Sequence, residues 1–351
     1  MASRLASWGE CLRLIEVLAD LGTGVFQMVE DPLMDPAGAE ARWQELVALS
    51  ADTGVPIATP VGRVDPSLGR LDMAAQAGAR MYGLAHPRGI GSMSSFLTQL
   101  PFDRLPVWCE FRTLPDEEQL RRLHDPVVVA QLVEAAHGSR YGEAVGAEAR
   151  PPDYEVMVLL DSPVPPNRTV AEVARERDLD PVELMIQLAI ETDLEQIFWQ
   201  TFMPIGYEDT ADLLRSPHVL MAFSDSGAHM SQMADASVHT HLLAYWVRDR
   251  QEFSFEEAIR MMTLTPARMW NLHDRGLLRE GLVADLNVID RDLVAPAMPC
   301  VVHDLPAGEA RIEQRSVGIG ATLVAGEVTV RDGVHTGQFP GSLLRAKAPQ
   351  R

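Results

Sequence analysis

Short apolar runs alternate with segments of helical apolar spacing over the first two-thirds of the sequence, and this alternation restricts the fold more than any other feature. Parallel strands need a crossover connection, which is usually a helix, so the alternation predicts an α/β protein with a parallel sheet. The expected strands are residues 24–29, 56–59, 80–85, 154–160, 194–200 and 218–223. The expected helices are residues 8–21, 39–50, 68–79, 117–123, 127–136, 169–177, 181–191, 207–214, 240–250 and 254–264.

The sequence after Trp270 has a different pattern, with strand-like segments joined by glycine-containing turns. It predicts two parts, a larger α/β portion over residues 1–279 and a small β subdomain over residues 280–351. The larger portion offers about six parallel strands, fewer than the eight that close a barrel. An open sheet and a barrel without its first strands are both consistent with that number. Residues 86–114, rich in Pro, Gly, Ser and aromatic residues, are expected to form a lid or substrate loop.

The acidic composition restricts the partners of the protein. Its 30 Lys and Arg residues against 50 Asp and Glu residues give a net charge of −20, which repels phosphate backbones and anionic lipids. We therefore expect neither nucleic acid nor membrane as a partner. No apolar run approaches the roughly 20 residues of a membrane span, and none near the start resembles a signal peptide, so a cytoplasmic location is expected.

The cysteines and several missing motifs exclude other classes. The 3 cysteines are far apart and form no CxxC pair, so they are expected to be reduced, buried thiols rather than a disulfide framework or zinc knuckle. The sequence lacks GxGxxG, GxxxxGK[ST], GxSxG and HExxH. These absences argue against the common dehydrogenases, NTPases, serine hydrolases and zincins.

Asp225 is the first candidate for a catalytic residue. It follows the expected strand 218–223, and the carboxyl ends of parallel strands are where α/β proteins place their active sites. A carboxylate there can take a proton from an attacking water and return it to a leaving amine, or it can bind a metal. Asp is also a common turn residue, so a capping role is the alternative.

Arg88 and His229 are candidates for substrate contacts. Arg88 follows the expected strand 80–85, and its planar guanidinium suits a carboxylate; a solvent-facing loop arginine is the alternative. His229 lies four residues after Asp225 in the same loop and either faces the site or is exposed. The pair His239 and His241 has the HxH spacing of metal ligands on a strand. It falls in an expected helix, where i and i+2 diverge by about 200°, so we exclude it as a metal pair.

An ordered series of motifs carries a resemblance to a known family. Its segments are residues 224–229 (Ser-Asp-Ser-Gly-Ala-His), 246–250, 256–260, 263–267, 274–276, 281–290 (Gly-Leu-Val-Ala-Asp-Leu-Asn-Val-Ile-Asp), 330–337 and 340–341. Together they resemble the C-terminal two-thirds of the N-acyl-D-amino-acid deacylase (D-aminoacylase-like) branch of the amidohydrolase superfamily. The resemblance is strongest over residues 215–345.

The resemblance implies a zinc-dependent (β/α)₈ barrel with a β-sandwich subdomain that hydrolyses amide bonds of N-acylated amino acids. Asp225 matches the family's aspartate at the end of the eighth barrel strand, which acts on the metal-bound water. Other family features are missing: no HxH pair precedes the first helix, and the expected strands 24–29 and 56–59 are not followed by metal-ligand histidines. Glu30 is an oxygen-ligand candidate, or simply a solvated strand-end residue.

We therefore expect an incomplete (β/α)₈ barrel that lacks its first strands, with zinc implied by the family and its ligands unknown. An unpaired sheet edge needs a cover, which a second copy or a partner chain would provide. Two functions follow. The first is hydrolysis of N-acyl (D-)amino acids or related small-molecule amides with Asp225 as general base. The alternative is a truncated, metal-free, non-catalytic homologue that binds a ligand or completes its barrel with a partner chain.

Overall fold

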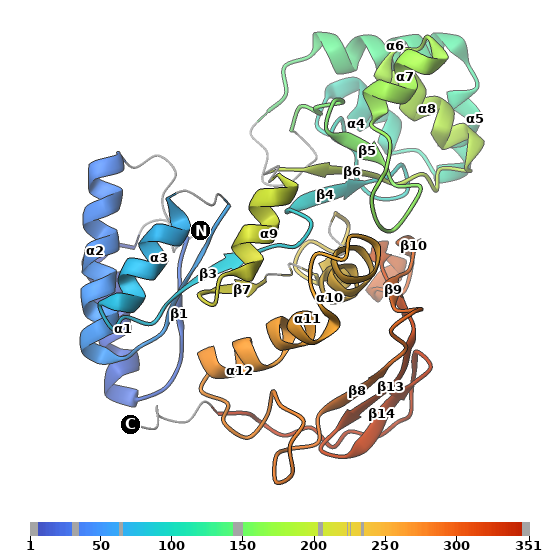
Figure 1. Ribbon diagram of the computed structural model, residues 1–351. Helices are drawn as coiled ribbons and strands as arrows, with labels where there is room; N and C mark the ends of the chain where they lie inside the picture. Colours follow the sequence, from blue (N-terminus) through green and yellow to red (C-terminus); the bar gives the residue numbers. More distant parts are fainter. Residues whose placement is uncertain are drawn as a thin grey trace.

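A four-stranded parallel sheet organises the first part of the computed structural model, which describes residues 6–29, 35–62, 66–142, 150–202, 206–222, 224, 226–232 and 235–345. The strand order is β1 (Phe26–Gln27), β2 (Ile57–Pro60), β3 (Met81–Ala85) and β7 (Val219–Met221) (Figure 1). The helices around this sheet are α1 (Trp8–Leu21), α2 (Pro36–Thr53), α3 (Ser67–Gln76) and α9 (Tyr207–Arg215). Each strand runs parallel to its neighbour, so the expected parallel sheet is confirmed for these four strands.

Local signals in the sequence fix the ends of these helices. Helix α1 begins after Ser7, whose side chain accepts from the Glu10 N–H, and it ends at Gly22 in the left-handed conformation. The apolar faces of the helices bury Ile15 and Leu71 against the sheet residue Ile57, all three at 1% exposure or less. Burial of each such side chain contributes about 1.5–3 kcal/mol, so this core holds β1, β2 and β3 in one layer.

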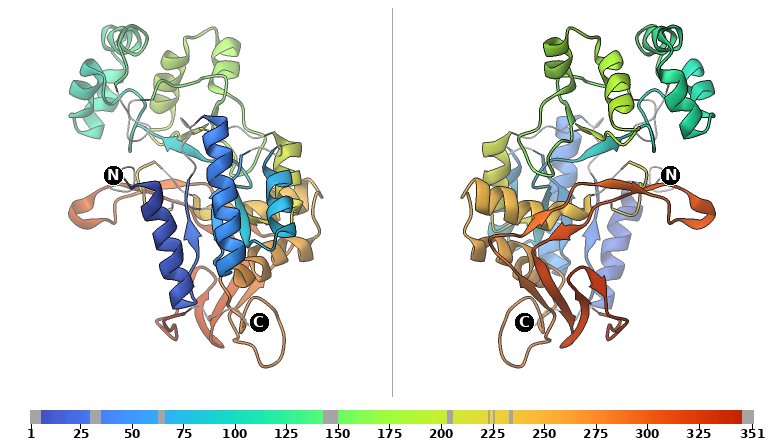
Figure 2. Two further views of the ribbon diagram at one scale, coloured as in Figure 1. Left: turned by 90° about the vertical axis from the view of Figure 1, so that its left-hand side faces the viewer. Right: turned by 90° about the vertical axis from the view of Figure 1, so that its right-hand side faces the viewer.

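A long insertion separates β3 from α9 and β7 and forms a second body at the opposite end of the molecule from the C-terminal strands at residues 286–289 and 319–331 (Figures 1 and 2). Its elements are β4 (Gly91–Ser94), α4 (Pro106–Arg112), α5 (Asp116–Leu123), α6 (Pro126–Gly138), β5 (Met157–Leu159), α7 (Val170–Arg177), α8 (Pro181–Glu191) and β6 (Phe198–Thr201). The strands form an antiparallel sheet of order β4-β6-β5. The assignment of residues 154–160 and 194–200 to the parallel sheet is therefore wrong.

Residues 86–114, expected to form a lid or substrate loop, do not form one loop, because they include β4 and α4. Phe96, Phe102 and Trp108 are each 0% exposed and form the centre of the insertion's own core. The Trp108 indole Nε1 donates to the Leu132 carbonyl at 2.9 Å, which satisfies its polar atom inside this core. The aromatic residues of this segment thus build the insertion instead of covering a site as a lid.

The last part of the chain begins with helices and ends in antiparallel strands. Its helices are α10 (Val238–His241), which continues as a π-helix over Leu242–Asp249, α11 (Phe255–Met262) and α12 (Leu264–Met269). One sheet has the order β15 (Val334–His335), β14 (Glu327–Arg331), β13 (Ile319–Val324) and β8 (Leu286–Ile289). Two further pairs join β9 (Ala295–Pro296) with β12 (Ser316–Val317), and β10 (Cys300–Val302) with β11 (Arg311–Glu313). The division at residues 279 and 280 stays a prediction.

The starts of two helices and the state of the cysteines were also expected from the sequence. Asp180 caps α8 through the Val182 N–H, and the capping box that begins at Ser254 starts α11, so both predicted helix starts are confirmed. The cysteines are free, as expected, but Cys109 and Cys300 are exposed, so the expectation of buried thiols is wrong.

The described strands do not establish the incomplete barrel, which stays a prediction. Strands β1 and β7 lie at the two edges of the parallel sheet as described. Within the described ranges, every helix is too short or too polar to cross a bilayer.

Candidate functional site

The carboxyl ends of β3 and β7 lie side by side in the parallel sheet. Ala85 pairs with Met221, and the Ala222 N–H donates to the Ala85 carbonyl at 2.9 Å. The chain leaves β3 into His86 and Arg88, and it leaves β7 toward Asp225. Asp225 itself lies outside the described residues, so its predicted role as general base stays a prediction.

Two buried histidines accompany Arg88 at this end of the sheet. His86 and His241 are each 2% exposed. Burial, followed by the charge of Arg88, lowers the pKa of His86 to about 3. The pKa of His241 is also lowered to about 3, mainly by burial and, to smaller extents, by the charges of Arg88 and His86. Both imidazoles are therefore neutral at neutral pH, which leaves the half-buried Arg88 as the cation among these three side chains.

The segment that carries Arg88 is fixed by neighbouring aromatic residues. The Arg88 guanidinium carbon lies 5.8 Å from the Trp199 ring centroid. The backbone N–H of Arg88 donates to His86 Nδ1 at 3.2 Å. The Trp246 indole donates to the Pro87 carbonyl at 2.7 Å from the π-helix. No sequence signal singles out His86 beyond its place directly after a buried strand.

His239 and His241 lie on a helix, as expected. In this helix, α10, His241 is buried and His239 is exposed. His241 Nδ1 has no hydrogen-bond partner among the residues that the structure describes. The two rings therefore do not face one common point, as metal ligands would.

His229 lies at a cavity of about 480 Å³ beyond the end of β7. Three segments line it, namely the loop after β7, a turn at the start of the insertion, and the loop between β10 and β11. The lining residues are Leu97, Thr98, Gln99, Ala228, His229, Met230, Ser231, Gln232, Leu305, Glu309 and Ala310. The sequence predicted His229 near a site and offered residues 86–114, which contain the lining turn, as a lid or substrate loop, but no sequence signal marked the β10–β11 loop.

The loop that carries His229 is held from both sides by hydrogen bonds. The Met93 N–H donates to the Gln232 carbonyl at 2.6 Å, and the Gln232 side-chain amide donates to the side chain of Gln99. On the other side, the Ile312 N–H of β11 donates to the Met230 carbonyl at 2.8 Å. The insertion and the C-terminal strands thus meet at the loop that follows Asp225.

The turn that brings Thr98 and Gln99 to the cavity is fixed by Arg112. Its guanidinium donates to the carbonyls of Phe96 and Thr98, the latter at 2.9 Å, and it pairs with Asp103 at 3.2 Å. Three contacts from one planar group restrain this turn, so its side chains are positioned before any ligand binds.

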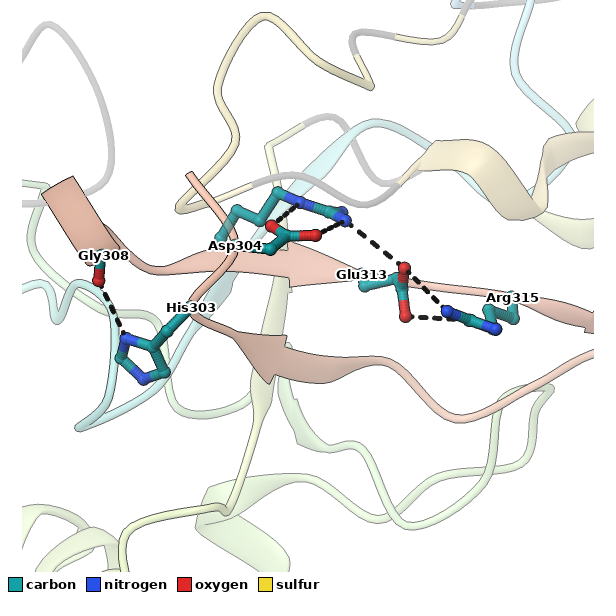
Figure 3. Close-up of polar contacts among 6 residues, drawn as sticks. His303, Asp304, Gly308, Glu313 and Arg315 are labelled. Atoms are coloured by element: carbon teal, nitrogen blue, oxygen red, sulfur yellow. Dashed lines mark hydrogen bonds and ion pairs between the residues drawn. The ribbon is translucent and has the colours of Figure 1, made fainter. Parts of the chain in front are cut away.

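The β10–β11 hairpin carries a network of ion pairs (Figure 3). Arg311 binds Asp304 through two hydrogen bonds of 2.6 and 2.7 Å and contacts Glu313 at 3.3 Å. Arg315 binds the same Glu313 at 2.9 Å, and the His303 ring donates to the Gly308 carbonyl at 3.3 Å. The network fixes the shape of the loop that closes the cavity.

A family comparison matches residues 125–330, which include the loop after β7 and most of the C-terminal strands, to a model described as the amidohydrolase family. The chain belongs to the amidohydrolase family. An N-acyl-D-aspartate deacylase of Alcaligenes xylosoxydans xylosoxydans is 40% identical over 106 residues, which are 30% of this chain and 19% of that protein. The resemblance to the N-acyl-D-amino-acid deacylase branch is thereby confirmed.

Longer relatives and solved structures extend this result. An uncharacterised protein of Mycobacterium tuberculosis is 27% identical over 199 residues, which are 53% of this chain and 32% of that protein. A D-aminoacylase structure, described for its binuclear metal centre, has a TM-score of 0.52 and 18% identity over 95% of this chain and 58% of that chain. The amidohydrolase thus spans about a third of the length of its curated mycobacterial relative and shares its fold with D-aminoacylase.

The family implies a metal centre, and the described residues do not fit one. No group of three or more His, Cys, Asp or Glu side chains converges on a point in the described part of the chain. The buried histidines have the cation Arg88 beside them, which opposes a bound metal ion. Glu30, the oxygen-ligand candidate, lies outside the described residues. We therefore derive no step of the reaction through zinc.

Proposed function

We propose that this amidohydrolase hydrolyses the amide bond of N-acyl amino acids, including D-amino acids, or of related small-molecule amides. The family match over residues 125–330 carries the proposal, because it covers the loop after β7 with Asp225 and His229. Two features support it: the cavity at that loop and a half-buried arginine at the end of the neighbouring strand.

Asp225 acts as the general base. Its carboxylate takes a proton from the attacking water while a C–O bond forms at the amide carbon. The same proton then passes to the leaving nitrogen as the C–N bond breaks, which gives a carboxylic acid and an amine, and the acid then loses its proton to the amine or to solvent. Atoms and charges balance with one water consumed and one proton carried by Asp225.

Arg88 binds the carboxylate of the amino acid. Its guanidinium lies beside two histidines that burial holds neutral. The two rings therefore neither add a second positive charge nor neutralise the charge of Arg88. A planar fork of donors recognises a carboxylate through two parallel hydrogen bonds. His229, at the cavity wall, contacts the bound substrate.

The test is turnover of a panel of N-acyl-D- and N-acyl-L-amino acids, with and without added zinc. We expect amine release that Asp225→Asn reduces by about 10³-fold or more, as loss of a general base does. Asp332→Asn, on an exposed turn between β14 and β15, is the matched control and should keep full activity. An Asp225→Asn variant as active as the control would refute the assignment.

Metal analysis of the purified protein separates this function from the metal-free, non-catalytic alternative. Stoichiometric zinc that is lost together with activity on chelation would exclude the alternative. Protein that lacks zinc and turns over no panel member would favour it.

The remaining expectations are proposals with simple tests. The edge of the parallel sheet at β1 is the place where we propose that a second copy or a partner chain adds a strand. Light scattering of the purified protein would show a monomer if no copy binds there. Fractionation of the source cells would test the proposed cytoplasmic location.

A further inference from the structure

The wall of the cavity at His229 includes a carboxylate, whereas an acidic substrate would need a positively charged group there. Among the described lining residues, the ionisable side chains are His229 and Glu309. The other lining groups are the amides of Gln99 and Gln232, two hydroxyls and apolar side chains. Glu309 is therefore the carboxylate that the described wall presents to a ligand.

Glu309 is not neutralised by the arginines of its own hairpin. Arg311 is engaged by Asp304 and Glu313, and Arg315 is engaged by Glu313 (Figure 3). Glu309 forms no ion pair with any residue within the ranges that the structure covers, and its side chain is exposed. Its negative charge is thus available to a ligand in the cavity.

The position of Glu309 is fixed by the fold. It follows the 3₁₀ turn Pro306–Gly308 and precedes β11, whose Ile312 N–H bonds the Met230 carbonyl at 2.8 Å. The anchor lies three residues along the chain from Glu309, so the carboxylate stays close to the loop that carries His229. On the opposite wall, Arg112 restrains the turn that carries Gln99.

We propose that this cavity holds the side chain of the acylated amino acid and that Glu309 makes it select neutral and basic side chains over acidic ones. This inference rests on the proposed function. The amides of Gln99 and Gln232 can donate to and accept from an uncharged polar side chain. An acidic side chain would meet the Glu309 carboxylate, and a like charge in a partly solvated site disfavours binding by about tenfold.

The inference separates this chain from the relative with which it shares 40% identity over 106 residues, whose name specifies an aspartate substrate. Specificity depends on the side chains of the cavity wall, two segments of which lie on the insertion turn and the β10–β11 loop. A similar sequence over 106 residues therefore does not determine which amino acid is accepted.

The experiment compares N-acetyl-D-glutamate, N-acetyl-D-glutamine and N-acetyl-D-lysine by kcat/KM and, independently of turnover, by calorimetric binding. We expect the wild-type protein to prefer the glutamine compound over the glutamate compound by about tenfold at low salt, and less at high salt. Glu309→Gln should remove this preference, and Glu309→Lys should reverse it. Glu327→Gln and Glu327→Lys, at an exposed position on β14, are the matched controls and should keep the wild-type ratio.

Each result decides the inference. Equal kcat/KM for the two compounds, or a ratio that Glu309→Lys leaves unchanged, would overturn it. Binding with the expected ratio but without turnover would retain the selectivity and refute the hydrolytic function. A protein that neither binds nor turns over any of the three compounds would refute both.

Discussion

The buried histidines predict how the stability of the protein depends on pH. Both His86 and His241 have a pKa of about 3 in the folded protein, against an ordinary value of 6.5. Because the folded pKa is depressed, the unfolded chain binds more protons between these values. Stability is therefore full above the ordinary pKa and falls as the pH decreases toward the folded pKa.

The magnitude follows from the same two values. At about pH 5, each buried histidine costs about 2 kcal/mol of stability relative to neutral pH, so the two together cost about 4 kcal/mol. That is a large share of the roughly 5–15 kcal/mol by which most domains are stable. Urea unfolding, followed by circular dichroism at pH 7.5 and at about pH 5, measures the difference directly.

Replacement of His241 by leucine isolates its contribution. The ring is 2% exposed, and its Nδ1 lacks a partner among the described residues, so an apolar side chain is tolerated at neutral pH. We expect His241→Leu to lose about 2 kcal/mol less than the wild-type protein on going to about pH 5. His273→Leu, at an exposed position, is the control. If His241→Leu and the wild-type protein lose the same stability, the histidine is not buried in its neutral form.

Three further substitutions test other parts of the structure. Arg112→Met keeps the side-chain length but removes the contacts to the Phe96–Thr98 turn, and we expect a loss of about 2–3 kcal/mol in urea unfolding, with a raised KM for every substrate. Trp108→Ala empties the centre of the insertion's core, so thermal unfolding should show a loss of about 3–5 kcal/mol, whereas a loss under 1 kcal/mol would contradict the described packing. Gly91→Ala places a Cβ against the Gln200 carbonyl between β4 and β6 and should lower the melting temperature, while Gly138→Ala, where the space is open, should leave it unchanged.

The sequence allowed the local structure to be predicted well where the signal lies within one segment. The helices over residues 8–21 and 181–191 were predicted with the observed bounds of α1 and α8. Strand pairing was predicted less well. Residues 157–159 and 198–201 read as strands of the parallel sheet but form an antiparallel sheet with β4. A short apolar run shows that a strand is buried, but it carries no information about its partner.

In the candidate site, too, residues marked by a local signal could be predicted and residues brought together by long-range contacts could not. Arg88 and His229 could be selected because each follows a strand, and chain order alone places them near the carboxyl end of a parallel sheet. His86 and His241 could not be paired, because they are far apart in the sequence and only the tertiary structure buries both and brings them near each other. Glu309 was not found at all, since nothing local marks it, and Gln99 was included only as part of the expected lid or substrate loop over residues 86–114.

The sequence by itself determined the family, because the ordered motifs from residue 224 onward and the match over residues 125–330 depend on residue identity alone. It also determined the helix ends, which depend on short-range hydrogen bonds of capping residues. Only the tertiary structure decided what surrounds His229. The insertion turn and the β10–β11 loop reach the cavity through long-range contacts, the Gln99–Gln232 and Met230–Ile312 hydrogen bonds, between residues that no sequence period relates.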